Sequence, residues 1–188
     1  VRAAYDLRPE GIVWPPKKEN GNPAFKLTDM TAANGISHEG AHDALSDVNA
    51  TIAVAKLIKE KQPKLFSYYL DLRKKAAVKE MMQVPLGEPV LYTSSQFTSP
   101  NGCSRLVMPI TAVPNNPNPI ICFDLSNDIA ILLRTDQNDI MRVPGVLKIA
   151  MNKCPFISPL KVLTSDLAIK LGIDFDTCMF RYDRLVHE

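Results

Sequence analysis

The sequence has few cysteines and histidines, the side chains that most often bind transition metals. Four cysteines and three histidines occur in 188 residues. The cysteines, Cys103, Cys122, Cys154 and Cys178, stand 19 to 32 residues apart, with no C-x-x-C pair. A zinc ribbon and a redox dithiol both need such a pair, so the spacing argues against both. We expect four buried thiols, which suits a reducing cytoplasm.

Long apolar runs and a strong charge of one sign are also lacking. No apolar run approaches the roughly 20 residues of a membrane span. Val1 opens no positively charged leader, so we expect a soluble, cytoplasmic protein with no membrane partner. The net charge of +2 is too small to indicate nucleic-acid binding by itself, although it permits a local basic surface. Apolar residues make up 46% of the chain, which is enough to fill a core.

The first residue indicates a fragment. Val1 stands where a natural chain normally has Met, and it lies in a stretch, VRAAYDL, that is typical of a helix. Upstream residues that complete a catalytic set would be missing from such a fragment. We expect lost packing partners to leave apolar helix faces exposed, with dimerisation or disorder of residues 1 to 40 as the response.

The N-terminal part of the chain has the pattern of helices joined by polar loops. One helix is predicted to start at Thr28, its N-cap, and to end before Gly35. The clearest helix runs from residue 43 to about residue 62, because apolar residues recur there with helical spacing. These residues are Leu45, Val48, Ile52, Ala55 and Ile58. Pro63 ends that helix and starts the next, which is predicted to run through KLFSYYLDLRKKAAVKEMM.

After residue 87 the pattern changes to short strands. The runs VLYTSSQF, SRLVMPITAV and PIICFDLS are β-branched or aromatic, and SPNG and PNNPNP separate them. We expect PNNPNP to be a surface loop. A further strand, GVLKIAMN, precedes a helix from Thr164 or Ser165 to Gly172. The sequence therefore predicts an α+β protein with two domains, a helical one over residues 1–62 and a β-rich one with helices over residues 63–188.

Two chemical motifs overlap in the stretch SHEGAHDALSD, residues 37–47. The first is H-E-x-x-H, formed by His38, Glu39 and His42, in which two histidines bind zinc and the glutamate acts as a base. This motif needs both histidines on one continuous helix. Gly40 interrupts it, and the periodic helix begins only after His42. The spacing therefore disfavours a zinc peptidase.

The second motif is H-x4-D, formed by His42 and Asp47. If Asp43 caps the helix, His42 lies in the loop before it and the Asp47 carboxylate leans back towards His42. An aspartate there can bind Mg²⁺, which prefers oxygen ligands. A nearby imidazole can take a proton from a metal-activated water that attacks phosphorus. The spacing alone also allows a first-turn acid favoured by the helix dipole, beside an unrelated loop histidine.

A family resemblance favours the second motif. The stretch NGISHEGAHDALSDVNATIAVAKLIKEKQPKLFSYYL, with LRPEGIVWP before it and NKCP after it, closely resembles the bacterial exodeoxyribonuclease I family. These are DEDD-type exonucleases of the histidine variant. The resemblance covers almost the whole chain, and AHDALSDVNATIA is its most specific block. It implies the helical C-terminal part of a ribonuclease-H-like exonuclease domain, followed by nearly all of an SH3-like β-barrel domain.

The resemblance also implies an activity and a cofactor. His42 matches the general base of the family, and Asp47 matches the last of its four metal-binding acids. The other three acids lie upstream of Val1. Family members use Mg²⁺ to remove nucleotides from single-stranded DNA in the 3′ to 5′ direction. We predict a monomeric parent enzyme, and a chain that is inactive alone because three metal-binding carboxylates are missing.

A protein partner is implied as well. The family is recruited by the acidic, apolar C-terminal tail of single-stranded DNA-binding protein, and Arg8 and Tyr68 match positions implicated in that contact. A guanidinium suits a terminal carboxylate as a bidentate partner. Residue type alone equally allows a surface arginine and a half-buried tyrosine. A second functional class stays open, in which the chain is a non-catalytic binding module for single-stranded DNA and this protein.

Overall fold

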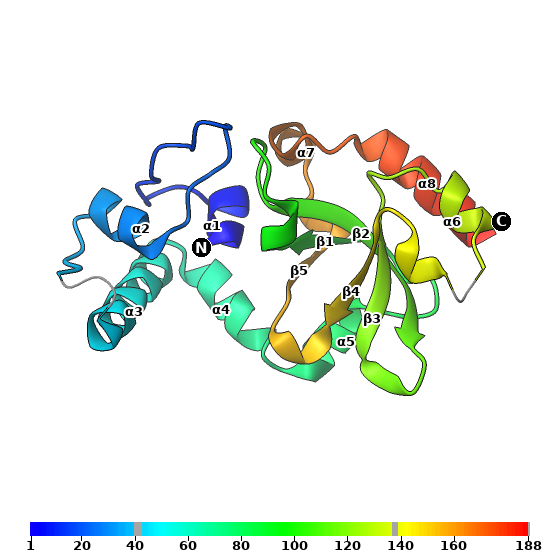
Figure 1. The fold of residues 1–188 in the computed structure, drawn as a ribbon, viewed down its shortest axis with the longest axis horizontal. Helices are drawn as coiled ribbons and strands as arrows, with labels where there is room; N and C mark the ends of the chain where they lie inside the picture. Colours follow the sequence, from blue (N-terminus) through cyan, green and yellow to red (C-terminus); the bar gives the residue numbers. More distant parts are fainter. Residues whose placement is uncertain (40–42, 137–138, 188) are drawn as a thin grey trace. The chain divides into compact units, whose positions relative to one another are not determined.

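The computed structural model describes residues 1–39, 43–136 and 139–187 (Figure 1). The chain divides into two compact units, one of residues 1–70 with 95–103 and the other of residues 71–94 with 104–188. The first unit is helical and the second contains an antiparallel sheet, so the predicted α+β class is confirmed. The domain boundary at residue 62 stays a prediction.

The first unit is built around one face of its longest helix. Its elements are α1 (Arg2–Leu7), α2 (Leu27–Ala33), α3 (Ala44–Lys61), most of α4 (Pro63–Asp71) and the 3₁₀ turn η1 (Ser95–Phe97). Val54 and Ile58 of α3 are buried against Ala4, Ile12 and Met30. Partly buried apolar side chains close this core: Trp14, Leu27, Ile36, Leu57, Leu65 and Phe66.

The end of α2 sets the path of the loop that follows it. The N–H of Ile36 donates to the carbonyl of Thr31 at 2.9 Å, and the N–H of Gly35 donates to the carbonyl of Ala32 at 3.3 Å. Gly35 has a φ of +64°, so the helix ends in a Schellman motif as the sequence predicts. This motif directs the chain out of α2 and towards His38.

Two of the predicted helix boundaries are wrong. Thr28 is not an N-cap, because the backbone becomes helical at Leu27 and Thr28 already lies in the first turn. The single helix predicted after Pro63 is two helices, α4 and α5 (Lys75–Met81). The break occurs because Lys74 has an extended backbone, with φ −78° and ψ 109°.

Residues 95–103 belong to the first unit although strands precede and follow them. The backbone N–H of Cys103 donates to the buried carboxylate of Asp6 at 2.9 Å. The Nζ of Lys17 donates to the carbonyl of Pro100 at 2.8 Å. These two hydrogen bonds attach the segment to α1 and to the loop after it.

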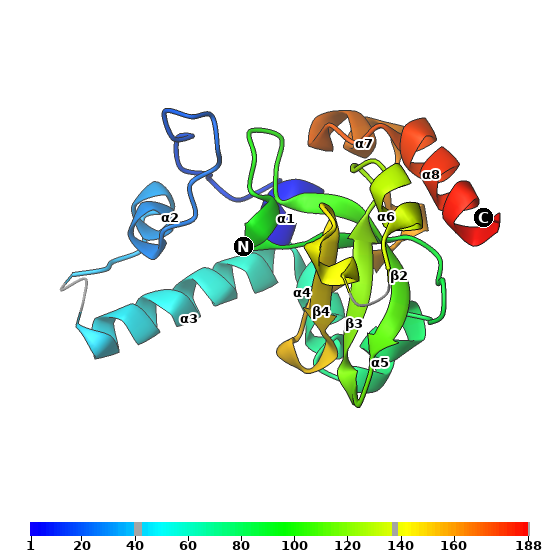
Figure 2. The ribbon, with the colours of Figure 1, turned by 45° about the vertical axis from the view of Figure 1, so that its right-hand side comes forward.

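The sheet of the second unit has five strands in the order β4-β3-β2-β1-β5, all antiparallel to their neighbours. Figure 2 shows β4, β3 and β2 side by side. The strands are β1 (Val90–Thr93), β2 (Ser104–Val113), β3 (Asn116–Asp124), β4 (Val146–Ala150) and β5 (Phe156–Pro159). The largest side chains that they bury completely are Leu91, Leu106, Met108, Phe123, Ile149 and Ile157. This set forms the core of the unit.

Helices and 3₁₀ turns surround the sheet. Helix α5 contributes the buried Val78. The later elements are α6 (Ala130–Arg134), η2 (Ile140–Arg142), η3 (Met151–Lys153), η4 (Leu160–Val162), α7 (Ser165–Leu171) and α8 (Phe175–His187). Thr164 accepts a hydrogen bond from the N–H of Leu167 at 3.3 Å, and Gly172 is left-handed, so the predicted limits of α7 are confirmed.

The predicted PNNPNP loop is a tight hairpin instead. Strand β2 extends to Val113 and β3 begins at Asn116, which leaves two residues for the turn. Asn115 has a φ of +59°, a left-handed conformation that asparagine tolerates better than most residues. The sequence overestimates the loop because its prolines and asparagines also occupy the exposed start of β3.

Candidate active site at the start of helix α3

The start of α3 is fixed by two short hydrogen bonds. The N-cap Asp43 accepts from the N–H of Ser46 at 3.1 Å, as the sequence predicts. The hydroxyl of Ser46 donates to the carbonyl of Glu39 at 2.6 Å. The second bond ties the preceding loop to the first helical turn. Side chains on this turn are therefore held in a defined position relative to residues 38 and 39.

Asp47 lies in this first turn and faces His38. Its Oδ1 is 2.7 Å from Nε2 of His38. The His38 side chain is 7% exposed, whereas that of Asp47 is 44% exposed. An ionised carboxylate only accepts hydrogen bonds, so Nε2 is the donor. The second ring nitrogen of His38, Nδ1, lies 3.4 Å from the hydroxyl of the buried Thr31 on α2.

The sequence predicts the place of Asp47 but not its contact with His38. Asp47, Val54 and Ile58 follow one another at intervals of seven and four residues, so they share one face of α3. This face packs against the core that contains Met30 of α2. The sequence therefore placed Asp47 in the first turn of α3, but it predicted neither the face of α3 that meets the core nor the loop path that brings His38 to Asp47.

His42, the predicted general base, lies outside the described residues. Its distance to Asp47 is therefore untested, and its role stays a prediction. The zinc-peptidase motif needs its histidines on one continuous helix. His38 and Glu39 instead lie between α2 and α3, outside any helix, which disfavours that alternative. Over residues 1–39, 43–136 and 139–187, no three His, Cys, Asp or Glu side chains gather as metal ligands.

The chemistry of Asp47 fits one ligand of a Mg²⁺ ion. Mg²⁺ is usually held by one or two carboxylates, keeps several waters and binds substrate phosphates. A half-exposed carboxylate in the first turn of a helix can fill one such position while water reaches the others.

The two predicted partner-binding residues both lie in the first unit. Arg8 is the exposed C-cap of α1, and one of its guanidinium nitrogens donates to the carbonyl of Leu7. Tyr68 is half-buried on α4. Their exposure leaves both side chains accessible to a peptide, and their role in binding one stays a prediction.

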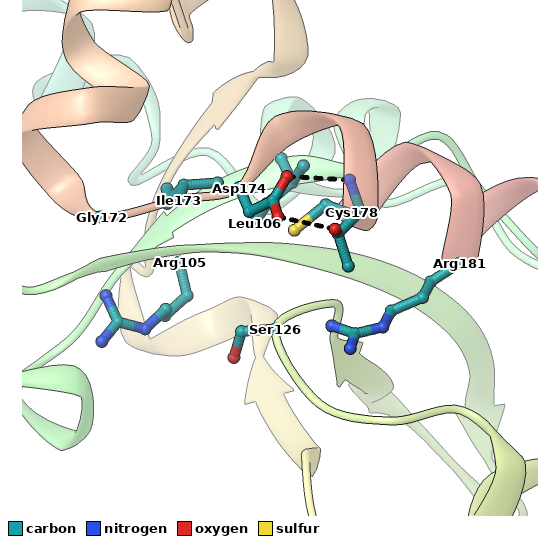
Figure 3. Close-up of a pocket in the computed structure, with 9 residues that line it drawn as sticks. Arg105, Leu106, Ser126, Gly172, Ile173, Asp174, Cys178 and Arg181 are labelled. Atoms are coloured by element: carbon teal, nitrogen blue, oxygen red, sulfur yellow. Dashed lines mark hydrogen bonds between the residues drawn. The ribbon is translucent and has the colours of Figure 1, made fainter.

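A separate pocket of about 270 Å³ lies within the second unit (Figure 3). Arg105 of β2, Ser126 and Arg181 of α8 are among its lining residues. Arg181 donates to the carbonyl of Leu125 at 2.8 Å. Asp174 caps α8 by accepting from both the N–H and the hydroxyl of Thr177, at 3.0 and 2.6 Å. The pocket thus combines two guanidinium groups with a carboxylate.

The titratable groups of this pocket are poorly suited to acid–base catalysis near neutral pH. Burial raises the pKa of the Cys178 thiol to about 11, so the thiolate is scarce. The hydrogen bonds from Thr177 lower the pKa of Asp174, which is therefore ionised. Neither group matches the pKa near 7 that a general base needs. The described residues that line the pocket therefore offer no general base for catalysis near neutral pH.

The comparison with protein families first defines the class of the second unit. Residues 73–188 match the family described as "Exonuclease I SH3-like domain". The family resemblance implied an SH3-like domain after the helical part of the chain, and this match confirms it. The chain therefore belongs to the exonuclease I family.

Relatives and solved structures extend this similarity to the first unit. The chain is 39% identical over 194 residues to exodeoxyribonuclease I of Haemophilus influenzae. That match covers 95% of this chain but 41% of the relative, so the chain spans about two fifths of its length. The crystal structure of E. coli exonuclease I in complex with a dA16 oligonucleotide matches with a TM-score of 0.92 and 36% identity, over 100% of this chain and 42% of that one.

Two further structures show what members of the family bind. An "ExoI/SSB-Ct complex" matches with a TM-score of 0.89 and 36% identity, over 98% of this chain and 42% of that one. A zinc-ion-bound E. coli ExoI–ssDNA complex matches with a TM-score of 0.90 and 37% identity, over 100% and 42% of the two chains. Those relatives therefore bind single-stranded DNA, SSB-Ct and a metal ion.

No helix in the described part of this chain is long and apolar enough to cross a membrane.

Proposed function

We propose that the chain is part of a Mg²⁺-dependent exonuclease that removes nucleotides from single-stranded DNA in the 3′ to 5′ direction. The observation that supports this most is the Asp47 carboxylate, held in the first turn of α3 and 44% exposed. Family membership and the oligonucleotide complex of a relative supply the substrate class. The direction and the preference for Mg²⁺ follow from the family resemblance.

The proposed chemistry divides the work between two side chains. Asp47 binds the metal through its carboxylate, and His42 accepts a proton from the water that attacks the terminal phosphodiester. When bound, Mg²⁺ would lower the pKa of that water and neutralise charge on the phosphate. The α3 dipole favours negative charge at its first turn, so it stabilises the ionised form of Asp47.

The 188-residue chain alone is proposed to be inactive. A two-metal site needs several carboxylates, and no three His, Cys, Asp or Glu side chains of the described residues gather as metal ligands. Purified chain with Mg²⁺ should leave a labelled single-stranded oligonucleotide intact. Degradation that His42→Ala abolishes would contradict this expectation.

The intact parent protein tests the activity itself. A single-stranded oligonucleotide labelled at its 5′ end should shorten from its 3′ end in the presence of Mg²⁺. General acid–base catalysis contributes typically about 10²- to 10⁴-fold, so His42→Ala should lower the rate at least about 100-fold. Asp47→Ala should do the same by removing a metal ligand. Glu60→Gln, an exposed change near the other end of α3, is the matched control and should leave the rate unchanged.

Two results would overturn this assignment. One is shortening of the oligonucleotide from its 5′ end. The other is a rate for His42→Ala or Asp47→Ala that equals the rate of the Glu60→Gln control. The first result would overturn the proposed direction of degradation. The second would leave the chain as the binding module of the second functional class, because family membership alone does not require the α3 site to be catalytic.

We also propose that the parent, a cytoplasmic monomer, binds the C-terminal tail of single-stranded DNA-binding protein through Arg8 and Tyr68. The SSB-Ct complex of a relative supports this partner. Arg8→Ala and Tyr68→Ala should each weaken binding of a tail peptide in a calorimetric titration. Arg8→Lys should recover only part of the affinity, because lysine lacks the bidentate fork of arginine. Equal affinity of the wild type and Arg8→Ala would remove Arg8 from the site.

A further inference from the structure

We propose that His38 is a positioning residue for the metal-binding carboxylate of Asp47. The Nε2–H of His38 donates to Oδ1 of Asp47 at 2.7 Å. This distance is in the short range of hydrogen bonds to an ionised acceptor. The bond selects one orientation of the carboxylate and so fixes the direction in which it meets an ion. This inference rests on the proposed function, because it assigns Asp47 to the metal site.

The difference in burial shows which partner is the anchor. The side chain of His38 is 7% exposed and that of Asp47 is 44% exposed. A buried ring loses its rotational freedom to packing, whereas a half-exposed aspartate can turn towards solvent. The imidazole therefore holds the carboxylate in place, and not the reverse.

The loop that carries His38 is itself attached on both sides. Before it, Ile36 packs against the core of the first unit and donates to Thr31 at the end of α2. After it, the carbonyl of Glu39 accepts from the hydroxyl of Ser46 on α3. A donor on a free loop could not define a ligand direction, because the loop would move with the ligand. Here the donor is part of a short bridge between α2 and α3.

The other edge of the ring meets a second fixed group. Nδ1 of His38 lies 3.4 Å from Oγ1 of Thr31, which is 1% exposed. The Thr31 hydroxyl also lies 3.0 Å from the carbonyls of Leu27 and Thr28 within α2. The ring is thus placed between a buried hydroxyl on one helix and a carboxylate on the next. Both contacts orient the imidazole plane.

This arrangement separates His38 from the catalytic base. Its Nε2 is engaged by Asp47 and its ring is buried, so it is badly placed to take a proton from an attacking water. Outer groups that hydrogen-bond a metal ligand act by orienting it, and their loss typically costs about 10- to 100-fold in metal affinity or activity. The role of His38 is to set the metal affinity of the site.

The test compares two substitutions in the intact parent protein. His38→Leu fills the buried space but cannot donate, whereas the amide of His38→Gln can reach Asp47 with its own N–H group. Mn²⁺ binding followed by electron paramagnetic resonance gives a readout that is independent of nuclease activity. We expect His38→Leu to weaken Mn²⁺ binding about 10-fold or more, and His38→Gln to recover most of that loss.

The Mg²⁺ dependence of the nuclease rate supplies a second readout. His38→Leu should raise the Mg²⁺ concentration at half-maximal rate, while the rate at saturating Mg²⁺ changes much less. His42→Ala should show the opposite pattern, with a lower maximal rate and little change in metal affinity. Thermal unfolding of each variant checks that the fold is retained. If His38→Leu does not fold, the comparison of His38→Gln with His38→Asn carries the test, because the shorter amide stops short of Asp47.

Asp47→Ala distinguishes failure of this inference from failure of the proposed function. If Asp47→Ala weakens Mn²⁺ binding and the His38 variant without a reaching donor does not, His38 has no positioning role and the proposed function stands. If Asp47→Ala leaves Mn²⁺ binding unchanged, Asp47 is not a ligand and both proposals fall. Metal affinity that drops equally in His38→Gln and His38→Leu would also overturn the positioning role, because a donor would then make no difference.

Discussion

The longest helix of the first unit and the sheet of the second unit differ in how completely they bury their apolar side chains. In the second unit, Leu91, Val107 and Phe123 on three adjacent strands are fully buried. In the first unit, Leu45, Val48 and Ile52 are 69%, 54% and 47% exposed. These three residues are spaced by three and four positions along α3, so they form one apolar face, called the α3 outer face below.

The difference shows that the sheet forms a closed core, whereas α3 presents an apolar face suited to a partner. Contiguous exposed apolar side chains are uncommon on monomeric proteins and mark interaction surfaces or sites of aggregation. The exposure of helix faces that the sequence predicts is confirmed for α3. The chain spans about two fifths of its relative from Haemophilus influenzae. We expect other parts of the parent to cover the α3 outer face.

The largest expected effect compares two leucines, one from each unit. Leu91 of β1 is fully buried, and Leu45 of α3 is the most exposed residue of the outer face. Leu91→Ala leaves a cavity and should lower the free energy of unfolding of the chain by about 2 to 5 kcal/mol. Leu45→Ala should change it by less than about 0.5 kcal/mol, as is usual for a surface substitution. Urea denaturation measures both values.

The comparison fails if Leu91→Ala and Leu45→Ala lower the free energy of unfolding by similar amounts. A large loss for Leu45→Ala would mean that the α3 outer face is covered within the 188-residue chain itself. A small loss for Leu91→Ala would mean that the second unit tolerates a cavity in its sheet core.

The second prediction concerns self-association of the chain. A chain with an uncovered apolar helix face should associate with itself, and replacing Leu45, Val48 and Ile52 together by serine should weaken that association. We expect the dissociation constant to rise at least about 10-fold, which corresponds to about 1.4 kcal/mol. Sedimentation equilibrium measures it. Matched serine changes at the exposed Ile131 and Leu133 of α6 are the control, and an equal effect there would contradict a role specific to α3.

Helix α3 also shows what could be read from the sequence and what could not. Its extent and its Asp43 cap follow from local signals: apolar residues at helical spacing and an N-cap residue before them. The helix has two rows of apolar residues, and their spacing did not show which row packs against the core. The predicted row contains both the exposed Leu45 and the buried Ile58, because two apolar rows occupy opposite sides of this helix.

The candidate site was predictable to the same degree. The H-x4-D spacing and the family resemblance together select Asp47, and α3 places it in the first turn as expected. The hydrogen bond from His38 depends on the path of the loop between α2 and α3, which hydrophobic periodicity does not encode. The local signal of that path was Gly35, the glycine predicted to end α2, which has the left-handed φ of a Schellman motif. Turn chemistry therefore carries information about sites that a helix pattern alone lacks.

A third, smaller effect compares helix caps in the two units. Asp43 caps α3 and Thr164 caps α7, each by accepting from a backbone N–H three residues later. Asp43→Ala and Thr164→Ala should each cost about 1 kcal/mol of stability in urea denaturation. In the parent, only Asp43→Ala should also lower the nuclease rate, because it loosens the turn that holds Asp47. Asp43→Asn keeps an acceptor and should recover both properties, and equal rate losses for the two caps would contradict this distinction.

The smallest expected effect is on the pKa of Asp174. It comes from a comparison of how hydrogen bonds fix a carboxylate at the start of a helix in each unit. Asp47 is bonded to a side chain brought from another part of the chain, whereas Asp174 is bonded to Thr177 in its own helix. The hydrogen bonds from the Thr177 hydroxyl and N–H lower the pKa of Asp174 below its ordinary value of 3.8. A carboxyl with a lowered pKa in the folded state stabilises that state above the unfolded pKa and loses this contribution as the pH falls through the folded pKa.

Substitution of the local donor tests this account of Asp174. Thr177→Val removes the hydroxyl but keeps the N–H, so the Asp174 pKa should move back towards 3.8 without reaching it. Thr28→Val on α2 is the control and should leave Asp174 unchanged. Carboxyl chemical shifts followed by NMR through an acid titration measure the pKa in each variant. If Asp174 already titrates at its ordinary value in the native chain, a carboxylate capped only by its own helix gains no measurable stabilisation of its charged form.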